Sequence, residues 1–500
     1  MASPKSKKLD LVLNIAFNVC NLFALLYLIR LSSDVMAPLI FSFFMLARRY
    51  ASAIANFLQL GTSQTLLRHL PLLGGNLVAK KNLLLAGHLI YAVLFLVTMA
   101  VAYFFSDCLG ALLFGSGTEY AAFTFWTLAL SVVTVGQFLV YSTAIAERHI
   151  ILANLINFFS TTGWFLVAIL YYKIAQKGAP DISSLESILG FHTICVLVSS
   201  LLAFVYYMKL YGREGDAEGH QSRREDLRTY WSYGVPRTAI TFLDSMTLVI
   251  GPWLLRHYPI EAGYIVVALS LLRMIQGLLM PISQLSGVFA AEALGANNET
   301  YLSRMVRFML GGYSFLTLLT AVFLLIWMDV IVDIWLSDPG LIEGVLKYSD
   351  IVILSILPFV LFNGLKQIIE NIWHAPKNLI SLVVSFVLFG LAFFFFDRIS
   401  GATVAVKAAY LAMFWGLGGA CLVWLRSYLQ GSFRYFLFVD WLFAIVAVHL
   451  TSRICKLYLG DWGILPAALV AALVTAILVF KSQSKFFAEI RQVFLKNVSP

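Results

Sequence analysis

Charged residues are scarce in this sequence, and their scarcity excludes a water-soluble fold. Asp, Glu, Lys and Arg make up 12% of the 500 residues, whereas 60% are hydrophobic. A chain of this composition has too few polar side chains to cover the surface of soluble domains. We therefore expect lipid to be the solvent for most of the chain.

Cysteine is also rare, and its positions argue against metal or redox chemistry. The five cysteines form no CxxC pair and no Cys/His cluster, so we predict no metal, no obligatory disulfide and no cofactor. The N-terminus has a basic start and a long apolar stretch. Because no small-residue cleavage site follows it, we expect a retained first span.

Long apolar stretches recur from one end of the sequence to the other. A spanning helix needs about 20 apolar residues, and runs of that length without period-2 alternation are typical of helices. The predicted fold is all-α, with about fourteen transmembrane helices. The predicted spans are 9–30, 37–59, 83–105, 121–143, 150–172, 187–208, 233–256, 263–287, 308–328, 350–371, 378–396, 404–425, 435–455 and 462–480.

The distribution of lysine and arginine predicts the orientation. Short loops rich in these residues stay in the cytoplasm. If the N-terminus is inside, the inner loops hold more than twice as many of them as the outer loops. We therefore predict an even number of spans with both termini cytoplasmic. The net charge of +9 follows from this loop bias, so it does not indicate a nucleic-acid partner.

Polar residues at corresponding positions indicate an internal repeat. Asn14, Asn18 and Asn21 lie on one face of the first span. Positions 223 residues further on, in the seventh span, are Arg237, Thr241 and Asp244. This spacing of four and three residues places each set on one helix face.

Two further matches have nearly the same offset. Arg48 and Gln59 in span two correspond to Arg273 and Gln284 in span eight, and Glu147 corresponds to Glu370. Because six spans per copy preserve the topology, we predict parallel repeats around a central cavity. The predicted parts are an N-terminal lobe (1–208), a cytoplasmic linker (209–230), a C-terminal lobe (231–427), and two extra helices with a tail (428–500).

Five basic residues fall inside predicted spans and make the expected cavity cationic. They are Arg48, Arg49, Arg237, Arg273 and Lys366, whereas acidic residues such as Asp244 and Glu370 are fewer there. An arginine facing lipid costs about 2.5–3.5 kcal/mol. Arginine forms bidentate bonds with phosphate, so the pattern favours an anionic, phosphate-bearing cargo. Structural pairing between helices, or snorkelling by Arg237 and Lys366, is the alternative.

Three segments resemble the polysaccharide flippases of the multidrug/oligosaccharidyl-lipid/polysaccharide exporter superfamily. They are GTSQTLLRHLP from Gly61 to Pro71, YWSYGVPR from Tyr230 to Arg237, and GYIVVALSLLRM from Gly263 to Met274. They occur in the order expected for that family, within its layout of six, six and two spans. The resemblance covers nearly the whole chain.

The resemblance implies a transporter that flips a polyprenyl-diphosphate-linked oligosaccharide across a bacterial inner membrane by alternating access. It implies membrane lipid, a polysaccharide polymerase and chain-length machinery as partners. On this hypothesis the five intramembrane cations hold the head group, and the three asparagines, Asn14, Asn18 and Asn21, contact sugar hydroxyls. Asp244 and Glu370 are the candidates for coupling or gating.

Three other functions remain open. A cation-driven multidrug exporter would use acidic residues in the first span, but no Asp or Glu lies between Leu11 and Ile29. A membrane glycosyltransferase or polymerase needs a catalytic group on a sizeable outer loop, and the outer loops contain no such constellation, so we predict no enzyme. A flippase for another lipid, such as the peptidoglycan precursor, would have a similar cationic cavity.

Overall fold

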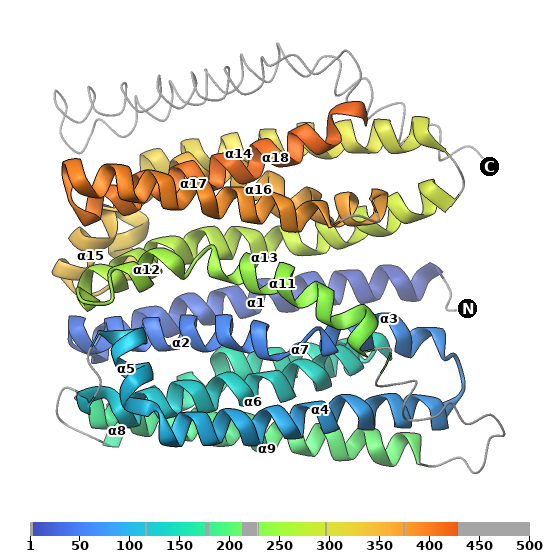
Figure 1. The fold of residues 1–500 in the computed structure, drawn as a ribbon, viewed down its shortest axis with the longest axis horizontal. Coiled ribbons are helices and arrows are strands. Elements are labelled where there is room, and N and C mark those ends of the chain that lie inside the picture. The colour runs from blue at the N-terminus through green and yellow to red at the C-terminus, as the bar shows by residue number, and fades with distance from the viewer. Residues whose placement is uncertain are drawn as a thin grey trace. The chain divides into compact units, whose positions relative to one another are not determined.

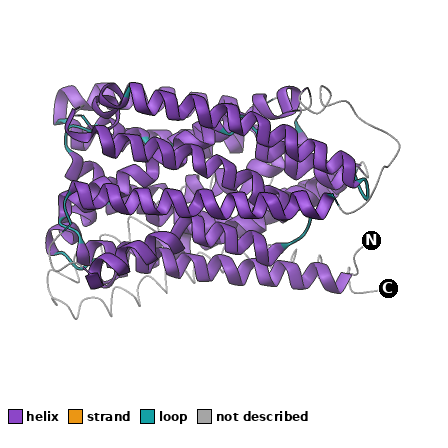
Figure 2. Ribbon diagram, turned by 90° about the horizontal axis from the view of Figure 1, so that it is seen from below, coloured by secondary structure: helices purple, strands orange, loops and turns teal. Residues whose placement is uncertain are grey.

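The computed structural model describes residues 4–115, 118–175, 180–212, 228, 230–295, 298–373 and 376–428. Every regular element in these ranges is a helix, and no strand occurs there (Figure 2). The predicted all-α class is therefore confirmed for this part of the chain. Most of the predicted linker, and the two predicted spans 435–455 and 462–480, lie outside the described residues.

The described residues of the first half form nine α-helices, one π-helix and one 3₁₀ turn, whose order along the chain can be followed in Figure 1. They are α1 (Pro4–Val35), α2 (Pro38–Leu58), α3 (Thr62–Leu72), α4 (Leu77–Phe104), α5 (Ser106–Phe114), α6 (Ala121–Ala146), α7 (Ile150–Phe158), the π-helix η2 (Phe159–Gly163), α8 (Trp164–Ala175) and α9 (Ile182–Tyr211). A short 3₁₀ turn, η1 (Thr118–Tyr120), precedes α6.

The second half begins with the π-helix η3 (Tyr230–Gly234). It continues with α11 (Val235–Met246), α12 (Ile250–Leu254), α13 (Pro259–Gly295), α14 (Glu299–Trp335), α15 (Pro339–Leu346), α16 (Ser349–Ile372), α17 (Lys377–Ser400), α18 (Ala402–Leu425) and the 3₁₀ turn η4 (Arg426–Tyr428).

Ten helices in the described ranges are long and apolar enough to cross a membrane. Two further predicted spans have local reasons for missing this criterion. Helix α2 has 21 residues, but Arg48 and Arg49 at its centre lower its hydropathy. The seventh predicted span is interrupted, because α11 ends at Met246 and α12 has only five residues. The protein is therefore a multi-span helical membrane protein.

The order of helices in the first half recurs in the second. A long span precedes the short α5, and α14 likewise precedes the short α15. The helices α6, α7 with α8, and α9 then correspond to α16, α17 and α18. This order agrees with the parallel repeat, which stays a prediction from the polar residues. The clearest difference is that α2 and α3 are separated at Leu60 and Gly61, where α13 is continuous.

Contacts between Cα atoms divide the chain into two compact units. The first unit contains the residues up to Val267 together with Trp335–Gly344. The second unit contains Ala268–Ile334 and the residues from Val345 onward.

One buried helix organises each unit. In the first unit α6 packs against α2, α4 and α9 (Figure 1), and most of its side chains are buried. In the second unit α16 packs against α18, which in turn packs against α17. By contrast, α4, α9 and α17 expose large apolar side chains such as Leu96, Leu202 and Phe394. Exposed apolar faces of this extent suit contact with lipid.

Candidate functional site

Arg48 lies in α2 and is held in the first unit by a carbonyl and two aromatic rings. Its Nη2 donates a hydrogen bond to the Thr161 carbonyl at 3.0 Å. Its guanidinium carbon lies 5.4 Å from the centroid of Phe44 and 5.1 Å from that of Phe165. None of these partners is a carboxylate. Because cation–π contacts and one carbonyl do not neutralise the charge, Arg48 remains a net positive group inside the membrane.

The acceptor of Arg48 belongs to the π-helix η2, which interrupts the fifth predicted span between α7 and α8. Thr162, the next residue of η2, donates a hydrogen bond to the Asn21 side chain of α1 at 3.3 Å. Single π-turns within helices occur frequently at functional sites. The structure thus brings two predicted site residues, Asn21 and Arg48, onto consecutive residues of one irregular turn.

A buried histidine lies behind this cluster. The His192 ring stacks on Phe165 with centroids 3.5 Å apart and an interplanar angle of 8°. Its side chain is fully buried. Phe165 therefore contacts both the Arg48 guanidinium and the His192 imidazole.

Arg273 lies in α13 and begins a chain of polar contacts in the second unit. Its Nη1 donates to Gln276 Oε1 at 3.0 Å. Gln276 Nε2 donates to Asn363 Oδ1 of α16 at 2.6 Å. The same oxygen accepts a hydrogen bond from Lys366 Nζ at 3.1 Å. Two predicted cations, Arg273 and Lys366, are thus linked through two neutral amides.

Glu370 lies one turn beyond Lys366 on α16. Asn378 of α17 donates to both the Lys366 carbonyl, at 2.9 Å, and Glu370 Oε1, at 3.0 Å. Glu370 is exposed, whereas Asn378 is buried. The predicted coupling residue therefore joins the polar region of α16 through the Asn378 amide.

The remaining predicted residues lie in α1, α2 and α11. Asn18, Arg49, Arg237 and Asp244 are all partly buried and all take part in polar or electrostatic interactions. Asn14 lies within α1, and its side chain is outside the described residues. The roles that the sequence indicates for these residues stay predictions.

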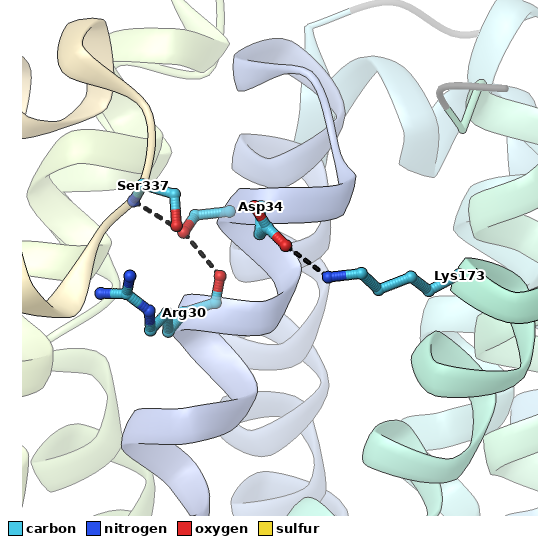
Figure 3. Close-up of polar contacts among 5 residues, drawn as sticks. Arg30, Asp34, Lys173 and Ser337 are labelled. Atoms are coloured by element: carbon cyan, nitrogen blue, oxygen red, sulfur yellow. Dashed lines mark hydrogen bonds and ion pairs between the residues drawn. The ribbon is translucent and has the colours of Figure 1, made fainter. Parts of the chain in front are cut away.

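Charged side chains near the ends of the spans form ion pairs, unlike Arg48 and Arg273, which bond to neutral groups. At the end of α1, Asp34 forms an ion pair with Lys173 of α8, and Ser33 links the Arg30 carbonyl to the backbone of Ser337 (Figure 3). These charged side chains are satisfied by each other, as expected of residues that hold helix ends together.

Lys80 and Glu147 form a second ion pair in the first unit. Lys80 Nζ lies 2.8 Å from Glu147 Oε1, with side chains that are only 9% and 18% exposed. The Tyr211 hydroxyl donates to the same carboxylate oxygen at 2.9 Å. These contacts join α4, α6 and α9, so Glu147 has a structural role.

Two of the three segments that resemble the flippases lie against each other. A Cβ atom on Gly61, whose φ is +68°, would lie 2.0 Å from the Gly234 carbonyl oxygen. Tyr230 is buried, and its hydroxyl donates to the Leu83 carbonyl at 2.9 Å. Because only glycine permits this approach, the two segments anchor the start of α11 to the first unit.

No family model and no curated protein matches the sequence. Solved structures do. A structure of the lipid II flippase MurJ in an inward closed conformation has a TM-score of 0.67 and 14% identity, covering 96% of this chain and 99% of that one. An inward-facing multidrug resistance MATE family transporter of the MOP superfamily has a TM-score of 0.60 and 12% identity, covering 84% and 99%. The MATE transporter VcmN of Vibrio cholerae, in its bent form, gives 0.56 and 14%, covering 84% and 96%.

The chain has the fold of the MOP superfamily transporters.

This fold is the one that the resemblance implies, and it confirms the predicted helical class. At these identities the similarity shows the fold alone. By name, the three similar structures are a lipid II flippase and two MATE transporters. In this MOP fold Arg48 and Arg273 occupy the second helix of each repeat, as the offset of 225 residues predicts.

Sequence reasoning missed several residues that surround these arginines. They are Thr161, Thr162, His192, Gln276 and Asn363. A polar residue within a predicted span was the available signal, since such residues are rare and face protein or water. Which of them meet an arginine depends on contacts between helices, which spacing along one helix does not predict.

Proposed function

We propose that this protein flips a polyprenyl-diphosphate-linked oligosaccharide from the inner to the outer leaflet of a bacterial inner membrane by alternating access. The observation on which the proposal rests is the pair Arg48 and Arg273. They occupy corresponding positions in the two repeats, and within the described ranges neither forms an ion pair with a carboxylate.

An unneutralised arginine in a span is costly, and this cost supports a role in binding an anion. A carboxylate placed on a neighbouring helix would offset the charge, as Asp34 offsets Lys173. Instead, Arg48 bonds to a carbonyl and Arg273 to a side-chain amide. Each guanidinium can therefore form charge-assisted bonds with phosphoryl oxygens of a cargo.

The other predicted residues have secondary roles in this proposal. Arg49, Arg237 and Lys366 are further candidates for binding the head group, and the three asparagines of α1, Asn14, Asn18 and Asn21, contact sugar hydroxyls. Asp244 and Glu370 contribute to coupling or gating. Moving a negative charge outward gains about 2.3 kcal/mol per 100 mV, so the membrane potential assists export without an ion site.

A lipid-linked peptidoglycan precursor is the second candidate cargo. The MurJ structure, a lipid II flippase by its name, covers 96% of this chain, whereas the two MATE structures reported above each cover 84%. Both lipid-linked cargoes have a diphosphate, so the arginines serve either one. The multidrug exporter is less favoured because α1 has no acidic residue between Leu11 and Ile29.

Complementation of a deletion strain tests the proposal. We expect loss of the gene to deplete surface polysaccharide and to trap polyprenyl-linked intermediates at the inner leaflet. Wild type should restore export, and Arg48→Ala combined with Arg273→Ala should not. The matched control is Lys173→Ala combined with Lys407→Ala, which also removes two cations but only from exposed ion pairs.

The outcomes separate the candidate functions. Membrane insertion of each variant is measured in parallel, so that a folding defect is recognised. Intact polysaccharide together with new sensitivity to cationic drugs would refute the flippase and favour a multidrug exporter. Loss of cell-wall precursor export with normal surface polysaccharide would favour the peptidoglycan cargo.

A further inference from the structure

A chain of polar contacts in the second unit links two cations through two neutral amides. It runs from Arg273 through Gln276 and Asn363 to Lys366. We propose that Arg273 and Lys366 together bind the two phosphoryl groups of a diphosphate. Gln276 and Asn363 are the positioning residues that hold these two cations in place. This inference rests on the proposed function and assigns the recognition of diphosphate, as opposed to monophosphate, to the second unit.

The orientation of the Asn363 amide is determined by the main chain. Asn363 is buried, and its Nδ2 donates to the Phe359 carbonyl of the preceding turn at 2.9 Å. A flipped amide would place Oδ1 against that carbonyl and lose this bond. Asn363 Oδ1 must therefore face the donors of Gln276 and Lys366, which lie at 2.6 and 3.1 Å.

The backbone around Asn363 is also held in place. The Ser283 hydroxyl, from α13, lies 2.8 Å from the Asn363 carbonyl and 3.2 Å from the Gly364 carbonyl. A Cβ atom on Gly364 would lie 2.3 Å from the Tyr313 ring of α14. Helices α13, α14 and α16 therefore meet closely at this point, and the cations attached to it have a restricted position. Such preorganisation is what a binding site requires.

Gln276 accepts a hydrogen bond from Arg273 but, as a neutral amide, does not cancel the charge of the guanidinium. Gln276 Oε1 accepts from Arg273 and Nε2 donates onward to Asn363, so both ends of the amide are used. The other guanidinium N–H groups of Arg273 have no acceptor in the part of the chain that the structure describes. Since a guanidinium has five donors, most of them can reach a ligand.

The first unit has no cation at the position that matches Lys366. At the offset that relates Glu147 to Glu370, Lys366 of α16 corresponds to Thr143 of α6. Arg48 is covered by Phe44 and Phe165. A single cation can bind one phosphoryl group of either a monophosphate or a diphosphate. Preference for a diphosphate over a monophosphate therefore requires a second cation, and Asn363 holds Lys366 in place for this role.

The test measures binding of farnesyl diphosphate and farnesyl monophosphate to the full-length protein in detergent by titration calorimetry. We expect wild type to prefer the diphosphate by about tenfold or more, the gain expected from one extra charge-assisted contact. Asn363→Asp places a carboxylate between the two cations and should remove this preference. Gln276→Ala breaks the link without adding charge and should reduce the preference several-fold.

The matched control is Asn371→Asp, two turns further along α16. Asn371 donates to the Gly287 and Gln367 carbonyls and lies outside the polar chain. It adds the same charge to the same helix and should leave the preference unchanged. A purely structural role of Asn363 would lower thermal stability in Asn363→Asp without changing the ratio of the two affinities.

Each outcome decides one of the two ideas. If wild type prefers the diphosphate and Asn363→Asp and Gln276→Ala keep that preference, the positioning role is wrong while the proposed function stands. If Asn363→Asp does not fold, Gln276→Ala alone decides the positioning role. If wild type binds neither probe, the proposed function fails, and the inference that rests on it fails as well.

Discussion

The two halves of the chain place an arginine at the same position of their second helix but surround it differently. Arg48 meets two aromatic rings and one carbonyl, whereas Arg273 enters a hydrogen-bonded chain of amides that ends at Lys366. A repeat thus preserves where a charge lies, while the residues around it determine what the charge can do. The first unit covers its arginine with aromatic rings, whereas the second unit links its arginine to another cation, Lys366.

The two glutamates at corresponding positions of the halves, Glu147 and Glu370, also have different surroundings. Glu147 forms a largely buried ion pair with Lys80 and accepts from Tyr211. Glu370 is exposed and accepts from the neutral Asn378. The first copy is therefore a structural contact, whereas the carboxylate of the second copy is exposed.

The largest effect is expected at Gly61, where α2 and α3 are separated whereas α13 is continuous in the second half. Gly61→Ala introduces a Cβ atom 2.0 Å from the Gly234 carbonyl at a φ of +68°, so we expect a loss of roughly 3 kcal/mol or more. Gly74→Ala is the control, because its φ is +56° but nothing lies within 4 Å; it should cost about 1 kcal/mol. Thermal unfolding of the purified protein measures both. Equal losses would show that the close approach is unimportant.

Breaking the two glutamate contacts should reveal their different burial. Glu147→Gln leaves Lys80 without its partner and should cost about 3 kcal/mol, whereas Glu370→Gln should cost less than about 1 kcal/mol. Unfolding temperatures in detergent report this difference. Combining Glu147→Leu with Lys80→Met should recover part of the loss, since it removes both buried charges. A larger loss for Glu370→Gln would reverse the assignment of roles.

Arginine-to-lysine substitutions test the different surroundings of the two cations. Lysine cannot reproduce a planar guanidinium stacked on rings, so Arg48→Lys should destabilise the protein by about 1–2 kcal/mol. Arg273→Lys keeps the charge and can still donate to Gln276, so it should cost about half as much. The unfolding temperature and export by complementation are measured for both. The comparison fails if Arg273→Lys is the less stable variant.

The smallest effect concerns the start of the sixth span in each half. Helix α9 is capped by Asp181, whereas α18 starts after Gly401 with no side-chain cap. Hydrogen bonds from the Ser184 hydroxyl, the Ser184 amide and the Ser183 hydroxyl lower the pKa of Asp181 to about 2. A lowered pKa stabilises the fold above the unfolded value of about 4, and this contribution disappears as the pH falls toward 2.

Asp181→Asn therefore measures that contribution. Its stability deficit relative to wild type should be constant above about pH 4 and shrink as the pH falls toward 2. Unfolding temperatures across this range provide the test. A deficit that persists unchanged at the lowest pH would mean that the carboxylate charge is not what stabilises the cap.

Much of the fold follows from the sequence because lipid imposes a simple rule. Every span must satisfy its own backbone, so apolar runs predict helices wherever they occur, and ten described helices meet that expectation. The broken seventh span and the π-turn of η2 did not follow from the sequence. Both are local departures from helix geometry that packing against other helices stabilises, and hydropathy does not record packing.

In the candidate site, too, the sequence indicates some of the residues and not others. Arg48, Arg273 and Lys366 could be found because a cation in an apolar run is conspicuous. Gln276 and Asn363 could not, because an amide in a span is equally well explained as a contact between helices. Their link became visible only when α13 and α16 were placed side by side within the second unit.

The sequence by itself therefore determined the helical class, the repeat and the positions of the intramembrane charges, because these depend on composition and spacing along one chain. Tertiary structure alone decided which groups surround each charge. Lys80 and Glu147 are 67 residues apart and form an ion pair, whereas Arg273 and Lys366 meet through amides on two helices. The energy of a charge in a membrane depends on the few groups within hydrogen-bonding distance, and only folding brings those groups together.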